Sequence, residues 1–120
     1  MTTWEERVGD LPASELDGGL TVHIARTARP RRRGLARLAD LPADRALHIL
    51  RCPAVHTFGM RFPLDLIWLD RHGRVIRVDR SVGAHRNRAC LKARSVVETR
   101  AGHADEFITA GIGDGYTRAR

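Results

Sequence analysis

The feature that most constrains the fold is a pair of apolar runs, residues 62–70 ("FPLDLIWLD") and 74–79 ("RVIRVD"). Both runs are rich in valine, isoleucine, leucine and tryptophan, which pack well on a pleated surface. The turn between them contains Gly73, and two such runs joined by a short glycine-containing turn are typical of a β-hairpin. We therefore predict that residues 62–70 and 74–79 pair as antiparallel strands.

Weaker patterns predict further elements on both sides of the hairpin. Alternating apolar residues, or short apolar runs next to turn residues, predict strands, and we assign them to residues 20–27, 95–99 and 113–118 and to the part of 41–52 that follows a turn at Pro42. A short helix is predicted over 101–111, because Gly111 is suited to the left-handed conformation that ends helices. A second helix is expected over 29–40, beginning at Pro30 and weakened by Gly34. Residues 80–94 are basic and predict a long loop.

These elements predict the architecture of a single domain, since 120 residues suffice for one hydrophobic core. We expect a mainly β fold, a small sandwich or partly open barrel of short, largely antiparallel strands with one or two short helices. Residues 1–19 are polar and are predicted to be an N-terminal arm or a short edge strand. Residues 20–120 form the expected β-rich domain.

The net charge of +7 comes from arginine, because Lys92 is the only lysine among 21 basic residues. This skew, with many alanines and glycines, is typical of a GC-rich bacterial genome. The charge still favours weak, non-specific binding of nucleic acid. A single-strand binder, however, needs aromatic platforms among its basic residues, and only 5% of this chain is aromatic.

The sequence also indicates a compartment. The N-terminal residues are polar and lack the apolar core of a signal peptide, and no run of residues is long enough to span a membrane. Two cysteines do not make a disulfide framework. We therefore expect a cytoplasmic protein with no membrane span.

The candidate site centres on Asp65, an acid within the apolar run. Side chains alternate between the two faces of a strand, and both faces here are largely apolar, so Asp65 is expected to be mostly buried. A buried carboxylate needs hydrogen bonds or a cation. Arg61, His56 or nearby backbone amides are the expected partners. Asp65 is then either a polar anchor that satisfies loop amides, or a general base or ligand-holding acid.

Two alternatives use the residues upstream of Asp65. Cys52 and His56 suggest a thiol nucleophile with its base, although a cysteine is more often a buried apolar residue. Cys52 and His56 together with His85 and Cys90 also supply four ligands that zinc accepts. Their spacings differ from those of common zinc motifs, so we expect neither a metal nor another cofactor.

Several ordered motifs resemble the domain-of-unknown-function family one-ninety-two (DUF192). They are "HTFGMRFPLDLIWLDRHGRVIRV" at 56–78, "RRRGLA" at 31–36, "VVETRAG" at 96–102 and "GIGDG" at 111–115. The resemblance implies a compact, mostly β fold of sandwich type and supplies no activity. The sequence departs from the family pattern at Ala84–Arg86, where the family has proline before an arginine, and at Thr99, where it has an apolar residue.

Together these observations favour a binding module for an unknown small molecule or protein partner, with a polar site around residues 52–65. One alternative is a small hydrolase-like or transferase-like enzyme that uses His56 and Asp65 as base and orienter. The other is a basic accessory protein that binds nucleic acid or an assembly partner. The candidate ligand-binding residues are Cys52, His56, Thr57, Met60, Arg61, Asp65 and Arg86.

Overall fold

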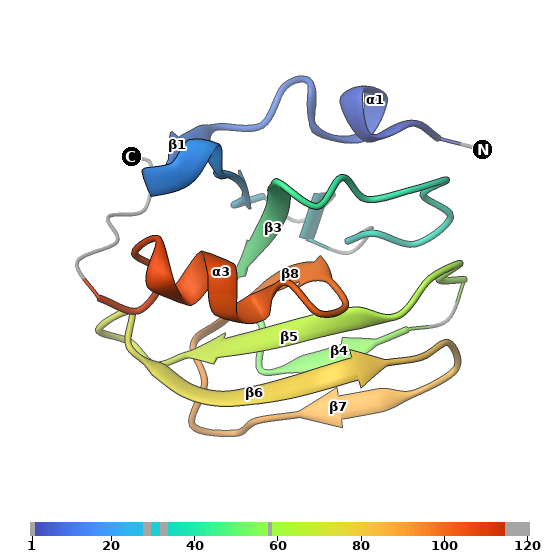
Figure 1. Ribbon diagram of the computed structural model, residues 1–120. Coiled ribbons are helices and arrows are strands. Elements are labelled where there is room, and N and C mark those ends of the chain that lie inside the picture. The colour runs from blue at the N-terminus through green and yellow to red at the C-terminus, as the bar shows by residue number, and fades with distance from the viewer. Residues whose placement is uncertain (1, 28–29, 32–33, 58, 115–120) are drawn as a thin grey trace.

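A computed structural model describes residues 2–27, 30–31, 34–57 and 59–114. Within this part of the chain, eight strands form a six-stranded sheet of order β1-β2-β3-β8-β5-β6 and a two-stranded ribbon of β4 and β7 (Figure 1). The mainly β, largely antiparallel fold with two short helices is confirmed, and the sheet does not close into a barrel. The strands are β1 (Ala13–Glu15), β2 (Thr21–Ala25), β3 (Arg45–Leu50), β4 (Ala54–His56), β5 (Leu64–Leu69), β6 (Val75–Val82), β7 (Asn87–Ala89) and β8 (Ser95–Arg100).

The predicted hairpin is confirmed, and it supplies one end of the sheet. β5 pairs antiparallel with β6, with Ile67 opposite Val78. Asp70 holds the connecting turn, because its carboxylate accepts hydrogen bonds from the amides of His72 (2.8 Å) and Arg74 (3.0 Å). All six residues of β5 are buried, since β8 lies along its other side and both faces of the sheet are covered.

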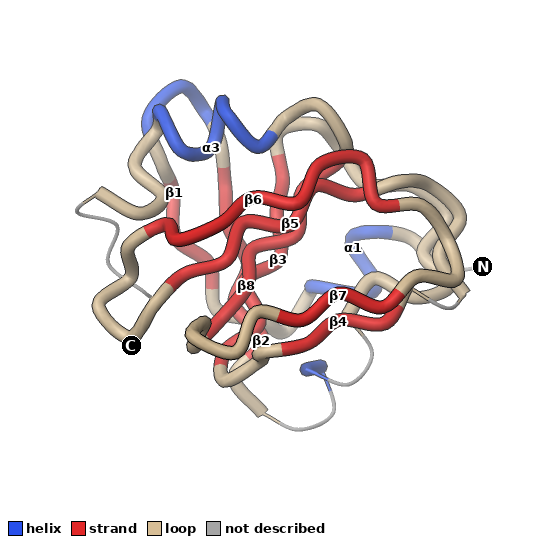
Figure 2. Tube along the Cα trace, turned by 90° about the horizontal axis from the view of Figure 1, so that it is seen from below, coloured by secondary structure: helices blue, strands red, loops and turns tan. Residues whose placement is uncertain are grey.

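Alternation along the central strands divides the apolar side chains between two cores. One face carries Leu66 and Trp68 and packs against the N-terminal segment and the β4–β7 ribbon. The opposite face carries Ile67 and Leu69 and packs under helix α3 (Ala104–Thr109), whose Phe107 is fully buried. Figure 2 shows α3 and the β4–β7 ribbon on opposite sides of the sheet. Helix α3 confirms the helix predicted over 101–111.

The N-terminal segment contains more structure than a loose arm. Helix α1 (Trp4–Val8) buries Trp4 and Val8 in the first core, a single 3₁₀ turn η1 covers Asp17–Gly19, and β1 is the edge strand that the sequence allowed. β1 pairs antiparallel with β2, and β2 pairs parallel with β3. Within the described part of the chain, no helix has the length and apolar character that a membrane span requires.

Three sequence predictions need correction or fall outside the description. Residues 80–94 are not a single loop, because β6 continues to Val82 and β7 follows. Strand β4 was not predicted. Residues 34–37 form turns rather than the second half of a helix over 29–40. The strand predicted over 113–118 lies mostly outside the described residues, and its first two residues form a turn.

Candidate functional site

The site is built on Thr57, a fully buried residue that immediately follows β4. Its hydroxyl donates to the carbonyl of Gly83 (2.7 Å) and accepts from the amide of Arg86 (2.8 Å). Its own amide donates to the carbonyl of Arg86 (2.9 Å), and its carbonyl accepts from the amide of His85 (3.3 Å). Thr57 therefore fixes the loop before β7 beside the loop after β4.

A third segment, residues 37–39, links the loop after β4 to a fourth segment at Thr2. The amide of Arg37 donates to the carbonyl of Gly59 (2.9 Å), and the amide of Ala39 donates to the carbonyl of Thr2 (3.0 Å). Between the four segments lies an open hollow of about 820 Å³. It is lined by Thr2, Arg37, Gly59, Met60, Arg61 and His85.

The backbone around this hollow is held in an uncommon conformation. Arg37 and His85 have φ values of 61° and 59°, in the left-handed region that residues with a Cβ rarely adopt. Gly59, with φ of 79°, occupies the same region without this penalty. Strained residues of this kind persist only where the surrounding structure holds them, and they concentrate at binding sites.

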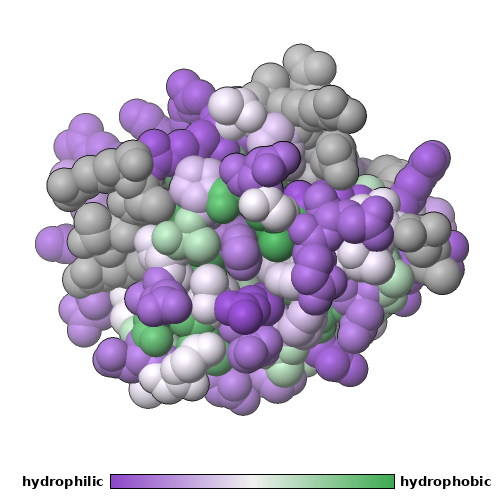
Figure 3. All heavy atoms as spheres, turned by 90° about the horizontal axis from the view of Figure 1, so that it is seen from above, coloured by the Kyte–Doolittle hydropathy of each residue, from purple (hydrophilic) through white to green (hydrophobic). Residues whose placement is uncertain are grey.

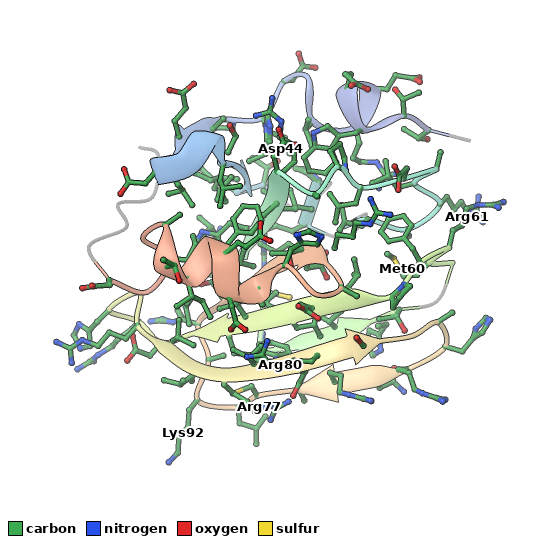
Figure 4. The ribbon with its side chains drawn as sticks, in the orientation of Figure 1. Asp44, Met60, Arg61, Arg77, Arg80 and Lys92 are labelled. Carbon is green, nitrogen blue, oxygen red and sulfur yellow. The ribbon has the colours of Figure 1, made fainter. Side chains whose placement is uncertain are left out.

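The hollow is cationic. Within the described residues, the guanidinium groups of Arg37 and Arg61 have neither an ion pair nor a hydrogen bond. Both side chains are exposed, and Figure 4 shows Arg61 pointing away from the body of the molecule while Met60 lies inward. Seen from above, the surface is mostly hydrophilic, with small scattered apolar areas rather than one apolar patch (Figure 3).

Asp65 lies apart from this hollow as a buried anchor. It is 1% exposed, as expected, and its Oδ1 accepts from the amide of Ser81 (2.9 Å). Its Oδ2 accepts from the amides of Gly102 (3.0 Å) and Ala104 (3.1 Å). The expected hydrogen bonding of Asp65 to backbone amides is confirmed. The other two expected partners, Arg61 and His56, are not among these donors.

His56 and Cys52 are also placed separately. Nδ1 of His56, which is exposed on β4, is hydrogen-bonded to the side chain of Asn87 on β7. Cys52 is half-buried, and burial raises the pKa of its thiol, which disfavours the nucleophilic thiolate. Within the described chain, no three side chains of histidine, cysteine, aspartate or glutamate gather as a metal site would require. The four residues of the zinc alternative are therefore not brought together.

The structure thus brings together some of the predicted site residues and not others. Met60 and Arg61 line the hollow, and Thr57 and the backbone of Arg86 support it. Sequence reasoning did not assign Arg37 or Thr2 to the site, and it considered His85 only as a zinc ligand. No local pattern marks these residues, because they meet through contacts between segments that are distant in the sequence.

A second buried acid, Glu98, was also missed. It lies in the middle of β8 opposite Leu47 and Leu66, and it is 2% exposed. Its Oε1 has no hydrogen-bond partner in the described structure. Burial raises the pKa of Glu98 to about 7, because the charged form loses its water. The only sequence signal is a glutamate between apolar residues of a predicted strand.

Comparison with solved structures shows the same fold in two proteins. The chain is similar to a protein of unknown function from Novosphingobium aromaticivorans DSM 12444, with 17% identity and a TM-score of 0.64 over 81% of this chain and 86% of that one. It is also similar to a putative transcription regulator from Sinorhizobium meliloti 1021, with 18% identity and a TM-score of 0.67 over 84% and 86%. At these identities the likeness shows the fold alone.

Comparison by sequence identifies the family. No curated protein matches the chain. The family model of DUF192, described as "Uncharacterized ACR, COG1430", matches residues 13–115, which include both sheets and most of the hollow. The chain therefore belongs to the DUF192 family.

Proposed function

We propose that this protein is a binding module for a small anionic ligand, and that the hollow bounded by Arg37, Arg61 and His85 is its site. The observation that carries the proposal is that two guanidinium groups at one hollow have no partner among the residues the structure describes. Some arginines elsewhere are paired, as Arg77 is with Asp79 (2.7 Å) and Arg80 with Asp105 (2.9 Å), and Arg37 and Arg61 differ in lying unpaired at one shared hollow among the described residues. Arginines left unpaired at a shared site are available to an added anion.

The chemistry of the lining supports a ligand that carries phosphate or carboxylate groups. A guanidinium group donates two parallel hydrogen bonds that match the oxygens of either group. Two arginines on different segments favour a ligand with more than one negative charge. Met60 adds a polarisable apolar contact that suits an organic ligand.

The two other interpretations have less support from the described contacts. The enzyme interpretation requires His56 to work with Asp65, yet within the described residues the carboxylate of Asp65 accepts its hydrogen bonds from three backbone amides. Binding of single-stranded nucleic acid requires stacking side chains among the basic residues. The lining of the hollow includes no tryptophan or tyrosine among its described residues.

Isothermal titration calorimetry with inorganic pyrophosphate and with citrate tests the proposal. We expect binding by at least one of the two to the wild-type protein at low ionic strength. Arg37→Gln and Arg61→Gln should each weaken it by about ten-fold, since a charge-assisted hydrogen bond contributes roughly 1.5–3 kcal/mol. Arg71→Gln removes the same charge from the exposed hairpin turn and is the matched control.

The outcomes separate a defined site from general charge attraction. Equal weakening by Arg71→Gln and Arg61→Gln would indicate binding through net charge alone and would contradict the proposal. Absence of heat with both probes would contradict it as well. Salt-sensitive binding of a short DNA duplex that is unchanged by Arg37→Gln and Arg61→Gln would favour the nucleic-acid alternative.

A further inference from the structure

Strand β6 is the longer of the two free edges of the main sheet. It runs for eight residues along one side of the main sheet, whereas β1 at the opposite edge has only three. Long edge strands present unpaired backbone groups to other chains, and natural proteins commonly shorten such strands or interrupt them with proline. β6 contains no proline and no lysine, and although its pairing with β5 shifts register near both ends, residues 77–79 keep a regular register.

The outer side of β6 is not covered by the ribbon that follows it. The chain leads from β6 into β7, but β7 pairs with β4. Figure 2 shows β7 well separated from β6, and within the described residues no strand pairs with the outer side of β6. Ile76, Arg77 and Arg80 are exposed along it, and Ile76 is one of two large apolar side chains that remain exposed in the described structure.

The charges on this edge are self-complementary. Arg77 and Asp79 lie on the same face of the strand, two residues apart, on either side of Val78. When two copies of β6 pair antiparallel with Val78 opposite Val78, Arg77 of each copy lies opposite Asp79 of the other. An edge strand that carries charges of one sign only repels a second copy of itself. β6 carries both signs, so two copies can approach.

We propose that the outer edge of β6 pairs antiparallel with β6 of a second copy, centred on Val78, to form a symmetric dimer with one continuous sheet. Cross-strand pairs of opposite charge stabilise such a ladder, and like charges directly opposite destabilise it. The interface is isologous, because every contact occurs twice about a two-fold axis. This inference is independent of the anion site.

The local contacts of β6 prepare it for this pairing. Arg77 donates to Asp79 through Nε (3.1 Å) and Nη2 (2.7 Å), and its guanidinium lies 5.6 Å from the centre of the Trp68 ring. Asp79 also accepts from Nε1 of Trp68 (3.0 Å). Both charged groups are thus held close to the strand, and ordering them costs little additional entropy on association.

A charge-exchange experiment with the full chain tests the dimer and its register. Arg77→Asp places two carboxylates opposite each other in a homodimer, and Asp79→Arg places two guanidinium groups opposite each other. We expect sedimentation equilibrium to show dimerisation of the wild type and at least about ten-fold weaker dimerisation of each variant. An equimolar mixture of the two should dimerise again, because both cross-strand pairs are then complementary. Arg71→Asp is the control outside the strand and should dimerise like the wild type.

A wild type that stays monomeric up to millimolar concentration would overturn the proposal. An equimolar mixture that dimerises no more strongly than the separate variants would overturn it as well. If circular dichroism shows that either variant is unfolded, hydrogen exchange of the wild-type protein tests the dimer instead. The dimer predicts that protection of β6 amides rises with protein concentration while protection in β1 does not. Protection that is independent of concentration contradicts it.

Discussion

At the scale of single residues, Asp65 shows both what the sequence predicts and where prediction ends. Its burial follows from an acid placed in a strand that is apolar on both faces, and this could be read from the sequence. Its partners could not, because Ser81, Gly102 and Ala104 lie 16 to 39 residues away along the chain. One carboxylate joins the end of β6 to the turn before α3.

Substitutions at Asp65 should show this anchoring role. Asp65→Ala removes the acceptor for three amides, one of them the fully buried amide of Ala104, and should lower the free energy of unfolding by on the order of 3 kcal/mol. Asp65→Asn keeps one oxygen, which can still accept from two amides, so its cost should be nearer to about 1 kcal/mol. Urea denaturation measures both, with exposed Asp10→Asn as the control.

The order of the two effects is the informative result. A larger loss for Asp65→Asn than for Asp65→Ala would mean that the carboxylate charge matters more than its hydrogen bonds. Wild-type midpoints for both variants would show that Asp65 is no anchor, and its place in the strand would then require a functional explanation.

At the scale of elements, prediction succeeded where a segment carries its own pattern. The β5–β6 hairpin and α3 have apolar periodicity and glycine-containing ends within a few residues. β4 and β7 have three residues each, too few to show a period, and they are strands only because they pair with each other. The hollow depends on that pairing, so its location was less predictable than the sheet.

Helix α1 is an element held by its surroundings. Five residues are too few for a stable helix in water. A capping box between Thr3 and Glu6 satisfies its first amides, and Arg7 donates to the carbonyls of Gly34 (2.7 Å) and Ala36 (2.7 Å). Trp4 is 6% exposed and meets His23 edge-on, with ring centroids 5.4 Å apart.

Trp4→Ala should therefore release α1 from the sheet. We expect the free energy of unfolding to fall by about 3 kcal/mol or more, as for other buried tryptophans replaced by alanine. Hydrogen exchange should also be faster in residues 4–8 than in β5. Because Thr2 lines the hollow, the variant should also bind pyrophosphate or citrate more weakly. Unchanged protection of residues 4–8 would contradict a docking role for Trp4.

At the scale of the whole molecule, the pKa values of half-buried His23 and of buried Glu98, which both lie on the first core face, are shifted in opposite directions. Burial lowers the pKa of His23, with the charge of Arg45 as a second cause, so its contribution to stability is full above pH 6.5 and is lost as pH falls through its lower folded pKa. Burial raises the pKa of Glu98 from 4.5 to about 7. Neither pKa shift could be read from the sequence, because the segments that cover the two side chains are remote along the chain.

Glu98 should make the protein less stable at alkaline pH. Between pH 4.5 and about 7 the folded state holds a proton on Glu98 that the unfolded chain has released, so the free energy of unfolding falls as pH rises. The shift corresponds to a total of about 3 kcal/mol, since one pKa unit is worth about 1.4 kcal/mol. We expect Glu98→Gln, which stays neutral, to remove this decrease.

Urea unfolding of the wild type and of Glu98→Gln at pH 5 and pH 8 isolates the effect. His23 and the other groups are common to both proteins, so the difference between the two pH dependences belongs to Glu98. Exposed Glu5→Gln is the matched control and should follow the wild type. If Glu98→Gln and the wild type lose stability in parallel between the two pH values, Glu98 is already neutralised by a partner or reached by water. Oε1 of Glu98 lies next to Gly34 and has no hydrogen-bond partner in the described structure. We therefore expect the wild type to lose more stability than Glu98→Gln between pH 5 and pH 8.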